Sequence, residues 1–354
     1  MRGMSEMTRR RLLLSLPAMA LVPRQPASVG TLTFAGRRAG QSAAPIRVRT
    51  LNHFAIAVTD PKRSVDFYQG LFGMPVAARN GPSTMLRVGA GPQFISIGPV
   101  AAGAAPSITH YCLGVDNFNV DRLLSALAAH GIKKGERTAP LTVAVSVRGA
   151  TTAEAGTPDL LFGDPDGIVC QLQDVSYCGG SGPLGNVCNA PEAAIKKGVL
   201  ALRDINHLTI FTGDAARANT FYQDLLGLSV RSYQGPAAPT LAVGPTVQFL
   251  MFTGGGPAAA TPRPATINHA CMSMDGFKPD AVLKALEGYG LKARDSAPGP
   301  AGPMRHYVTM RMENRGGAPG GTPELYFTDP DGLVIQLQDS SYCGGSGLLG
   351  ETCK

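Results

Sequence analysis

Histidines that recur in matching segments are the first candidates for chemistry in this chain of 354 residues. The chain contains six histidines, and four of them open alternating apolar runs in two pairs of similar segments: His53 with His207, and His110 with His269. Neutral imidazole is a good ligand for Fe(II), Mn(II), Zn(II) and Cu(II). A single strand histidine is more often a satisfied core residue, so these four are candidates whose role depends on what the repeated segments resemble.

A strand-like segment with two glutamines also occurs twice in the sequence. Residues 164–174 read DPDGIVCQLQD, and residues 329–339 read DPDGLVIQLQD. Side chains two residues apart lie on the same face of a strand, so Gln171 is predicted to face the same way as Gln173. The same holds for Gln336 and Gln338.

These residues belong to a duplicated domain of about 150 residues. The three pairs of similar segments are 51–76 with 205–230, 108–132 with 267–291, and 156–188 with 321–353. The last pair is identical at 24 of 33 positions. The predicted division is a first domain over 47–188, a polar, proline-containing linker over 189–200, and a second domain over 201–354.

Each domain is predicted to consist of two similar structural units. In the first domain, NHFAIAVT alternates like a strand, and the next segment has the cap Asp60, an early proline and the terminating Gly73 of a helix. Short strands follow, and a second unit begins at residue 108. The predicted unit is β-α-β-β-β, and four such units make the chain an α+β protein.

This order resembles the vicinal oxygen chelate superfamily, which includes glyoxalase I, bleomycin- and fosfomycin-resistance proteins and type I extradiol dioxygenases. The resemblance rests on FYQGLFG and FYQDLLG in the first helix of each domain and on DPDG before each last strand. It covers about residues 48–174 and 202–339. It implies two tandem domains, each with two βαβββ units forming a cupped mixed sheet that holds a divalent metal.

The resemblance also implies the metal ligands. His53 and His110 match the first two ligand positions of the extradiol dioxygenases, and Gln171 stands where the family has a glutamate. The second set is His207, His269 and Gln336. An amide oxygen is neutral and a weaker donor than a carboxylate, although some glyoxalases use glutamine. Fe(II) is the favoured ion, with Mn(II), Zn(II) and Cu(II) as alternatives.

Other residues are weaker candidates. Gln173 and Gln338 are predicted to support the ligands or to line the substrate pocket. Cys112 and Cys271 share a strand face with His110 and His269, as pocket residues, soft ligands or buried filler.

A third group of residues is harder to place in the repeat. His306 and Tyr307 are candidate acid–base residues, or strand-edge residues without a catalytic role. His130, at a helix end, is interpreted as structural.

Four cysteines bracket two similar glycine-rich loops, CGGSGPLGNVC and CGGSGLLGETC. We predict the disulfides Cys178–Cys188 and Cys343–Cys353, with a thiolate metal site as the alternative. Disulfides are typical of exported proteins.

The start of the chain predicts export. The run TRRRLLLSLPAMALVPRQPA has a basic start and an apolar stretch too short to span a bilayer. It resembles a twin-arginine signal, with an ordinary secretion signal or a basic tail as alternatives. Residues 1–46 are thus predicted to be a signal peptide and leader, and the mature protein to be periplasmic or extracellular.

The composition excludes some function classes. The net charge of +7 lies partly in the leader, and no Lys/Arg block is interleaved with aromatic residues. Nucleic-acid binding is therefore not expected, nor is membrane association after signal removal. The expected partner is a small molecule, and a homodimer is compatible with the sequence.

The favoured function is an exported metal-dependent enzyme that oxidises a small aromatic or enediol compound in a dioxygenase-type reaction. Two alternatives remain open. One is a binding protein that sequesters a small molecule without catalysis, and the other is a metal-dependent lyase or isomerase.

Overall fold

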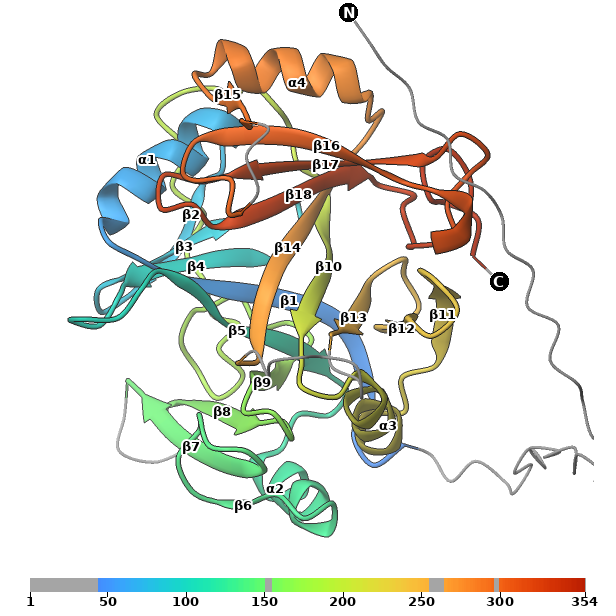
Figure 1. The fold of residues 1–354 in the computed structure, drawn as a ribbon. Helices are drawn as coiled ribbons and strands as arrows, with labels where there is room; N and C mark the ends of the chain where they lie inside the picture. Colours follow the sequence, from blue (N-terminus) through green and yellow to red (C-terminus); the bar gives the residue numbers. More distant parts are fainter. Residues whose placement is uncertain (1–43, 150–154, 255–263, 296–298, 354) are drawn as a thin grey trace, which may run out of the picture. The chain divides into compact units, whose positions relative to one another are not determined.

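The computed structural model describes residues 44–149, 155–254, 264–295 and 299–353 (Figure 1). The predicted signal segment lies outside these residues, apart from the last three positions of the leader. Within the described ranges, no helix combines the length and the apolar character that crossing a bilayer requires.

The first unit of each domain follows the predicted β-α-β-β-β order, and the second unit adds a two-residue strand after its helix. The α+β class is confirmed. The first domain contains β1 (Val48–Val58), α1 (Pro61–Phe72), β2 (Val76–Asn80), β3 (Ser83–Arg87), β4 (Phe94–Pro99), β5 (Ser107–Val115), α2 (Val120–Ala129), β6 (Lys133–Lys134), β7 (Thr142–Arg148), β8 (Thr157–Gly163) and β9 (Val169–Asp174). The second domain contains β10 (Asp204–Phe211), α3 (Ala215–Leu226), β11 (Val230–Tyr233), β12 (Pro239–Ala242), β13 (Phe249–Thr253), β14 (Thr266–Met274), α4 (Pro279–Gly288), β15 (Lys292–Ala293), β16 (Arg305–Arg311), the 3-10 turn η1 (Glu313–Arg315), β17 (Thr322–Thr328) and β18 (Val334–Asp339).

The first helix of each domain begins and ends where the sequence indicates. The Asp60 side chain accepts a hydrogen bond from the backbone N–H of Arg63, which satisfies a free donor at the start of α1. Gly73 ends α1 with φ of 67°, a left-handed conformation that glycine adopts without strain. Asp214 and Gly227 do the same for α3.

The sheet of each domain is built around its first strand. β1 pairs in parallel with β4 and antiparallel with β5, and β5 pairs in parallel with β9. The second domain repeats these pairings. β10 pairs in parallel with β13 and antiparallel with β14, and β14 pairs in parallel with β18. The first strands of the two units therefore meet at the centre of each sheet, where β1 lies beside β5 (Figure 1). This arrangement confirms the cupped mixed sheet.

The repeated FYQ and DPDG motifs join the two domains. Asp164, the first residue of DPDG, accepts hydrogen bonds through Oδ1 from the backbone N–H groups of Asp166 and Ile168. Its Oδ2 accepts from the hydroxyl of Tyr222 in α3 of the other domain, at 3.2 Å. The reciprocal bond runs from Tyr68 to Asp329. The motifs that define the repeat thus also hold its copies together.

The buried Asp164 predicts a pH effect on stability. Burial raises its pKa from 3.8 to about 6. Because the pKa is higher in the folded state, this carboxyl contributes stability that is present below pH 4 and is lost as the pH rises through 6. Asp164→Asn keeps the Oδ1 acceptor and removes the titration. Relative to wild type, the variant should gain about 2–3 kcal/mol in free energy of unfolding between pH 4 and pH 8.

Urea unfolding at the two pH values measures this gain. Asp121→Asn, at an exposed position of α2, is the control and should show no such change. An Asp164→Asn variant whose stability relative to wild type is the same at pH 4 and pH 8 would contradict the prediction.

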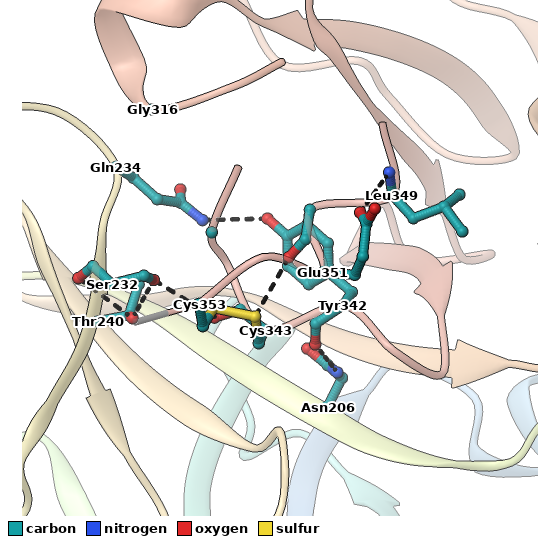
Figure 2. Close-up of a disulfide and its surroundings, with 12 residues drawn as sticks. Asn206, Ser232, Gln234, Thr240, Gly316, Tyr342, Cys343, Leu349, Glu351 and Cys353 are labelled. Atoms are coloured by element: carbon teal, nitrogen blue, oxygen red, sulfur yellow. Dashed lines mark hydrogen bonds between the residues drawn. A yellow bond between two sulfur atoms is a disulfide. The ribbon is translucent and has the colours of Figure 1, made fainter. Parts of the chain in front are cut away.

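The predicted disulfides are present, between Cys178 and Cys188 and between Cys343 and Cys353. Figure 2 shows the second one beside Tyr342, whose carbonyl accepts from Asn206. Backbone hydrogen bonds also close each disulfide loop, such as the bond from Cys343 N–H to the Gly350 carbonyl. These four cysteines therefore form no thiolate site.

Removing one disulfide should weaken the fold measurably. Serine at both Cys343 and Cys353 frees a loop whose ends are ten residues apart, which should cost about 2–3 kcal/mol of unfolding free energy. Urea unfolding of the variant, beside wild type kept oxidised, measures the loss. If both proteins unfold at the same urea concentration, the bridge does not restrict the unfolded chain as expected.

Candidate metal centres

The structure brings each predicted ligand set together on one concave face, which we call the first cup (β1–β9 sheet) and the second cup (β10–β18 sheet). In the first cup, Cys112 lies opposite both His53 and Gln171, so the three strands present one face there. The rings of His53 and His110 are 5.7 Å apart between centroids. In the second cup, the rings of His207 and His269 are 5.6 Å apart.

The first histidine of each cup is held in one tautomer. His53 Nδ1 lies 2.8 Å from Asn52 Oδ1, and Asn52 Nδ2 donates to the carbonyl of Tyr177. Since that amide oxygen only accepts, Nδ1 carries the proton and Nε2 keeps its lone pair. The ring of Phe94 stacks on His53 at 4.3 Å and fixes its plane. Such outer hydrogen bonds are typical of metal-binding histidines.

The second cup has the same hydrogen bond and the same ring stacking at its first histidine. His207 Nδ1 lies 2.8 Å from Asn206 Oδ1, and Phe249 stacks on the ring at 4.2 Å. His207 Nε2 then faces Gln336 Oε1 at 3.1 Å, so two acceptors converge. His269 Nδ1 bonds Asn268 Oδ1, which leaves its buried Nε2 without a partner among the described residues. A cation between them would satisfy the converging acceptors and the unpartnered ring nitrogen.

The histidines of both cups are neutral at pH 7. Burial lowers the pKa of His53 and His207 well below the usual value, and the neighbouring histidine lowers it further. Burial also lowers the pKa of His110 and His269 to about 4. Metal ligation requires the neutral ring, so these side chains need lose no proton.

The carboxylate that holds Gln171 was not predicted from the sequence. Gln171 Nε2 donates to Asp159 Oδ1 at 3.2 Å, which leaves the amide oxygen for the histidines. Asp159 is itself paired with Arg148 at 2.6 Å. Glu324 and Arg311 form the matching ion pair in the second domain, where the amide nitrogen of Gln336 has no partner among the described residues. The sequence does contain a signal for this carboxylate, because an acidic residue stands at matching positions of the repeat: Asp159 in GTPD and Glu324 in GTPE.

The donor set of each cup is neutral: two imidazoles and one amide. In the described parts of the chain, no three His, Cys, Asp or Glu side chains gather as a metal cluster. The set fits a divalent ion of intermediate softness, since both nitrogen and oxygen donors are present. Without a carboxylate, the site should bind more weakly and leave more positive charge on the ion.

Gln173 and Gln338 lie behind the ligands and not along the cavity. Gln173 Nε2 donates to the carbonyl of Pro158 and to Asp159 Oδ1, at 2.9 and 3.1 Å. Gln338 Nε2 donates to the carbonyl of Pro323. Both side chains are fully buried and tie their strand to its neighbour, and Gln173 also bonds the carboxylate of Asp159.

Cys112 lies between His53 and Gln171 in the sheet without lining the first cavity, and Cys271 has the same place between His207 and Gln336. Both are fully buried, and burial raises the pKa of each thiol well above its usual value. They are therefore neutral thiols, which favours the buried-filler interpretation over a thiolate ligand.

His306 does not reach the second cup, which corrects its placement as a catalytic candidate. It lies opposite Phe327, a core residue, and its Nε2 is 3.4 Å from Glu287 of α4. Tyr307 is on the other face of β16, opposite Tyr326, and it does face the cup.

His130 has a structural position, as interpreted from the sequence. It follows the last residue of α2, and its Nδ1 bonds the Ala126 carbonyl.

Solved structures share this fold at low sequence identity. The Mn(II)-bound glyoxalase from Novosphingobium aromaticivorans aligns with a TM-score of 0.55 and 17% identity, over 82% of each chain. A variant of homoprotocatechuate 2,3-dioxygenase from B. fuscum aligns at 0.54 and 17%, over 84% of this chain and 74% of its own. The 2,3-dioxygenase LapB from Pseudomonas sp. KL28 aligns at 0.54 and 13%, over 83% and 93%.

No curated protein matches the sequence significantly. The family model of the glyoxalase/bleomycin resistance protein/dioxygenase superfamily matches residues 50–172 and 204–337, which is most of the chain and one match for each domain. The fold, the doubled ligand sets and this match agree, and the chain belongs to the glyoxalase/bleomycin resistance protein/dioxygenase superfamily.

Proposed function

We propose that this protein is a metal-dependent enzyme that oxidises a small aromatic or enediol compound in a dioxygenase-type reaction. The observation that carries the proposal is the fixed tautomer of His53 beside His110 and Gln171, which presents neutral donors to one point. A cavity of about 270 Å³ opens onto these three side chains and gives room for a small substrate.

The residues have separate tasks in this proposal. His53, His110 and Gln171 hold the ion, with Fe(II) favoured. When bound, a divalent ion supplies Lewis acidity toward two adjacent substrate oxygens and toward O2. Asn52 keeps the proton on His53 Nδ1, and Asp159 holds the amide nitrogen of Gln171, so both donor atoms point into the cup.

Oxygen uptake tests the proposal. Protein loaded anaerobically with Fe(II) is mixed with catechols and enediols, and O2 consumption is followed with an electrode. Uptake that requires both the ion and His110 supports a dioxygenase. Conversion of a diol without O2 consumption would instead establish the lyase or isomerase alternative.

The sequestering alternative is favoured by one observation: a glutamine stands in each ligand set where a carboxylate would bind a divalent ion more tightly. A protein that binds no divalent ion at micromolar concentration, yet retains a small molecule, would be of this kind. Metal content therefore separates it from both enzymatic functions.

We also propose export by the twin-arginine route, motivated by Arg9, Arg10 and the apolar run that follows. Changing Arg9 and Arg10 together to lysine should leave the precursor in the cytoplasm, because that route requires the arginine pair. Cell fractionation measures the distribution. Normal export of the variant would favour an ordinary secretion signal.

A further inference from the structure

The two cups share their ligand sets but differ in the wall beside the glutamine. In the first cup, Ala144 of β7 lies opposite Leu161 of β8, and Leu161 lies opposite Gln171. In the second cup, the corresponding positions are Tyr307 and Tyr326, and Tyr326 lies opposite Gln336.

The two tyrosines occupy space in the second cup. Their rings stack at 5.2 Å, and the ring of Tyr326 meets that of His269 edge-on at 5.3 Å. His269 is 6% exposed and Gln336 1%. In the first cup, His110 is half-buried and borders the cavity of about 270 Å³.

The wall on the other side of each cup, formed by β4 or β13, also carries a larger side chain in the second domain. Ser96 lies on β4 two residues after Phe94, the residue that stacks on His53. Met251 has the same relation to Phe249 on β13. A serine therefore borders the first cup where a buried methionine borders the second. Both walls therefore carry larger side chains in the second cup than in the first.

The cavity of the first cup carries one uncompensated positive charge. Arg137, exposed in the turn between β6 and β7, lines the cavity and forms no hydrogen bond or ion pair with another described residue. Arg137 and His110 line the same cavity, so the guanidinium and the ring border one space. Arg148 also lines the cavity, but Asp159 neutralises it.

The charge balance favours an anion in this cup. The two imidazoles and the amide bring no negative charge to offset a divalent ion, and Arg137 adds a further positive charge. Arginine binds carboxylates through two parallel hydrogen bonds. A cavity of about 270 Å³ suits a single ring or a short chain with one substituent.

We propose that the first cup alone admits substrate, and that Arg137 selects small molecules that carry a carboxylate in addition to two adjacent oxygens. The second cup keeps its ligand set but is closed by Tyr307 and Tyr326. This inference rests on the proposed function only in taking His53, His110 and Gln171 as metal ligands.

Binding to Zn(II)-loaded protein tests the charge selection, because zinc has no redox chemistry and the readout is affinity. The matched probes are 3,4-dihydroxybenzoate and its methyl ester, which differ in the carboxylate charge. Calorimetry should find one site per chain that binds the acid at least roughly tenfold more tightly than the ester. Arg137→Gln should abolish this preference and leave ester binding unchanged.

Lys134→Gln is the control, because it removes an equal charge from the neighbouring β6 at an exposed position. It should keep the preference for the acid. Equal affinity of wild type for acid and ester, an unchanged preference in Arg137→Gln, or no binding of the acid would each overturn the inference.

A second pair of variants tests the assignment to the first cup. Ala144→Tyr copies the wall of the second cup and should abolish binding of the acid. Val145→Tyr places the same ring on the other face of β7 and should retain it. Circular dichroism checks that both variants fold. Two binding sites in wild type, or full binding in a folded Ala144→Tyr protein, would overturn the assignment.

The two proposals can fail separately. If no diol causes O2 uptake but the acid still binds through Arg137, the dioxygenase reaction is excluded and the binding inference stands. If O2 is consumed at equal rates with acid and ester, the reaction stands and the role of Arg137 is excluded.

Discussion

A His53→Ala protein should bind one divalent ion fewer per chain than wild type and keep the other. The ligands of each cup come from one domain, so loss of one set leaves the second set intact. His207→Ala should remove the ion of the second cup in the same way. Elemental analysis after equilibration with micromolar Mn(II) or Zn(II) measures the stoichiometry, with His130→Ala as the control outside both cups.

The glutamines extend this test. Gln336→Glu adds a charged donor beside His207 and His269, and should tighten metal binding by roughly tenfold, since affinity rises with ligand charge. Without metal, the same variant buries an unpaired charge and should be less stable than wild type. If Gln336 bonds only its neighbours, the substitution will destabilise the protein and leave metal affinity unchanged. Wild type that binds no ion would remove the metal site altogether.

The elements of the fold could be predicted because their signals are local and occur twice. Asp60 and Gly73 mark the ends of α1 by themselves, and the spacing of Cys178 and Cys188 permits a bridge without any knowledge of the fold. The histidines and glutamines stood out because they recur at equal positions of two similar segments. Their convergence then followed from the order of the strands.

Side-chain placement could not be predicted where it depends on register or on distant pairing. His306 and Tyr307 are neighbours, and only the pairing of β16 with β17 decides which one faces the cup. Asp159 and Arg148 are 11 residues apart, and nothing in the sequence marks them as partners among many charged residues. Tyr326 is one of nine differences in a 33-residue repeat, so its effect on the second cup was visible only in space.

The second domain should depend strongly on one ion pair at its cup. Arg311 is fully buried and its Nε lies 2.8 Å from Glu324 Oε1. Its other nitrogens donate to the carbonyls of Gly316 and Gly345, at 2.8 Å each. Tyr342, beside the disulfide, donates to the same Glu324 oxygen. This one guanidinium therefore connects the turn after β16, the carboxylate of the cup and the disulfide loop.

Arg311→Met should lower the free energy of unfolding by about 3–5 kcal/mol, because it leaves a buried carboxylate without its partner. Arg148→Met is the matched control in the first domain. There the side chains of the pair are 21% and 15% exposed, so water can solvate Asp159 and the loss should be smaller, about 1–2 kcal/mol. Adding Glu324→Met to Arg311→Met removes the unpaired charge and should restore part of the stability. Urea unfolding of the four proteins gives the comparison. Equal losses for Arg311→Met and Arg148→Met would mean that burial of the pair does not set its contribution, and that the two cups are held together in the same way.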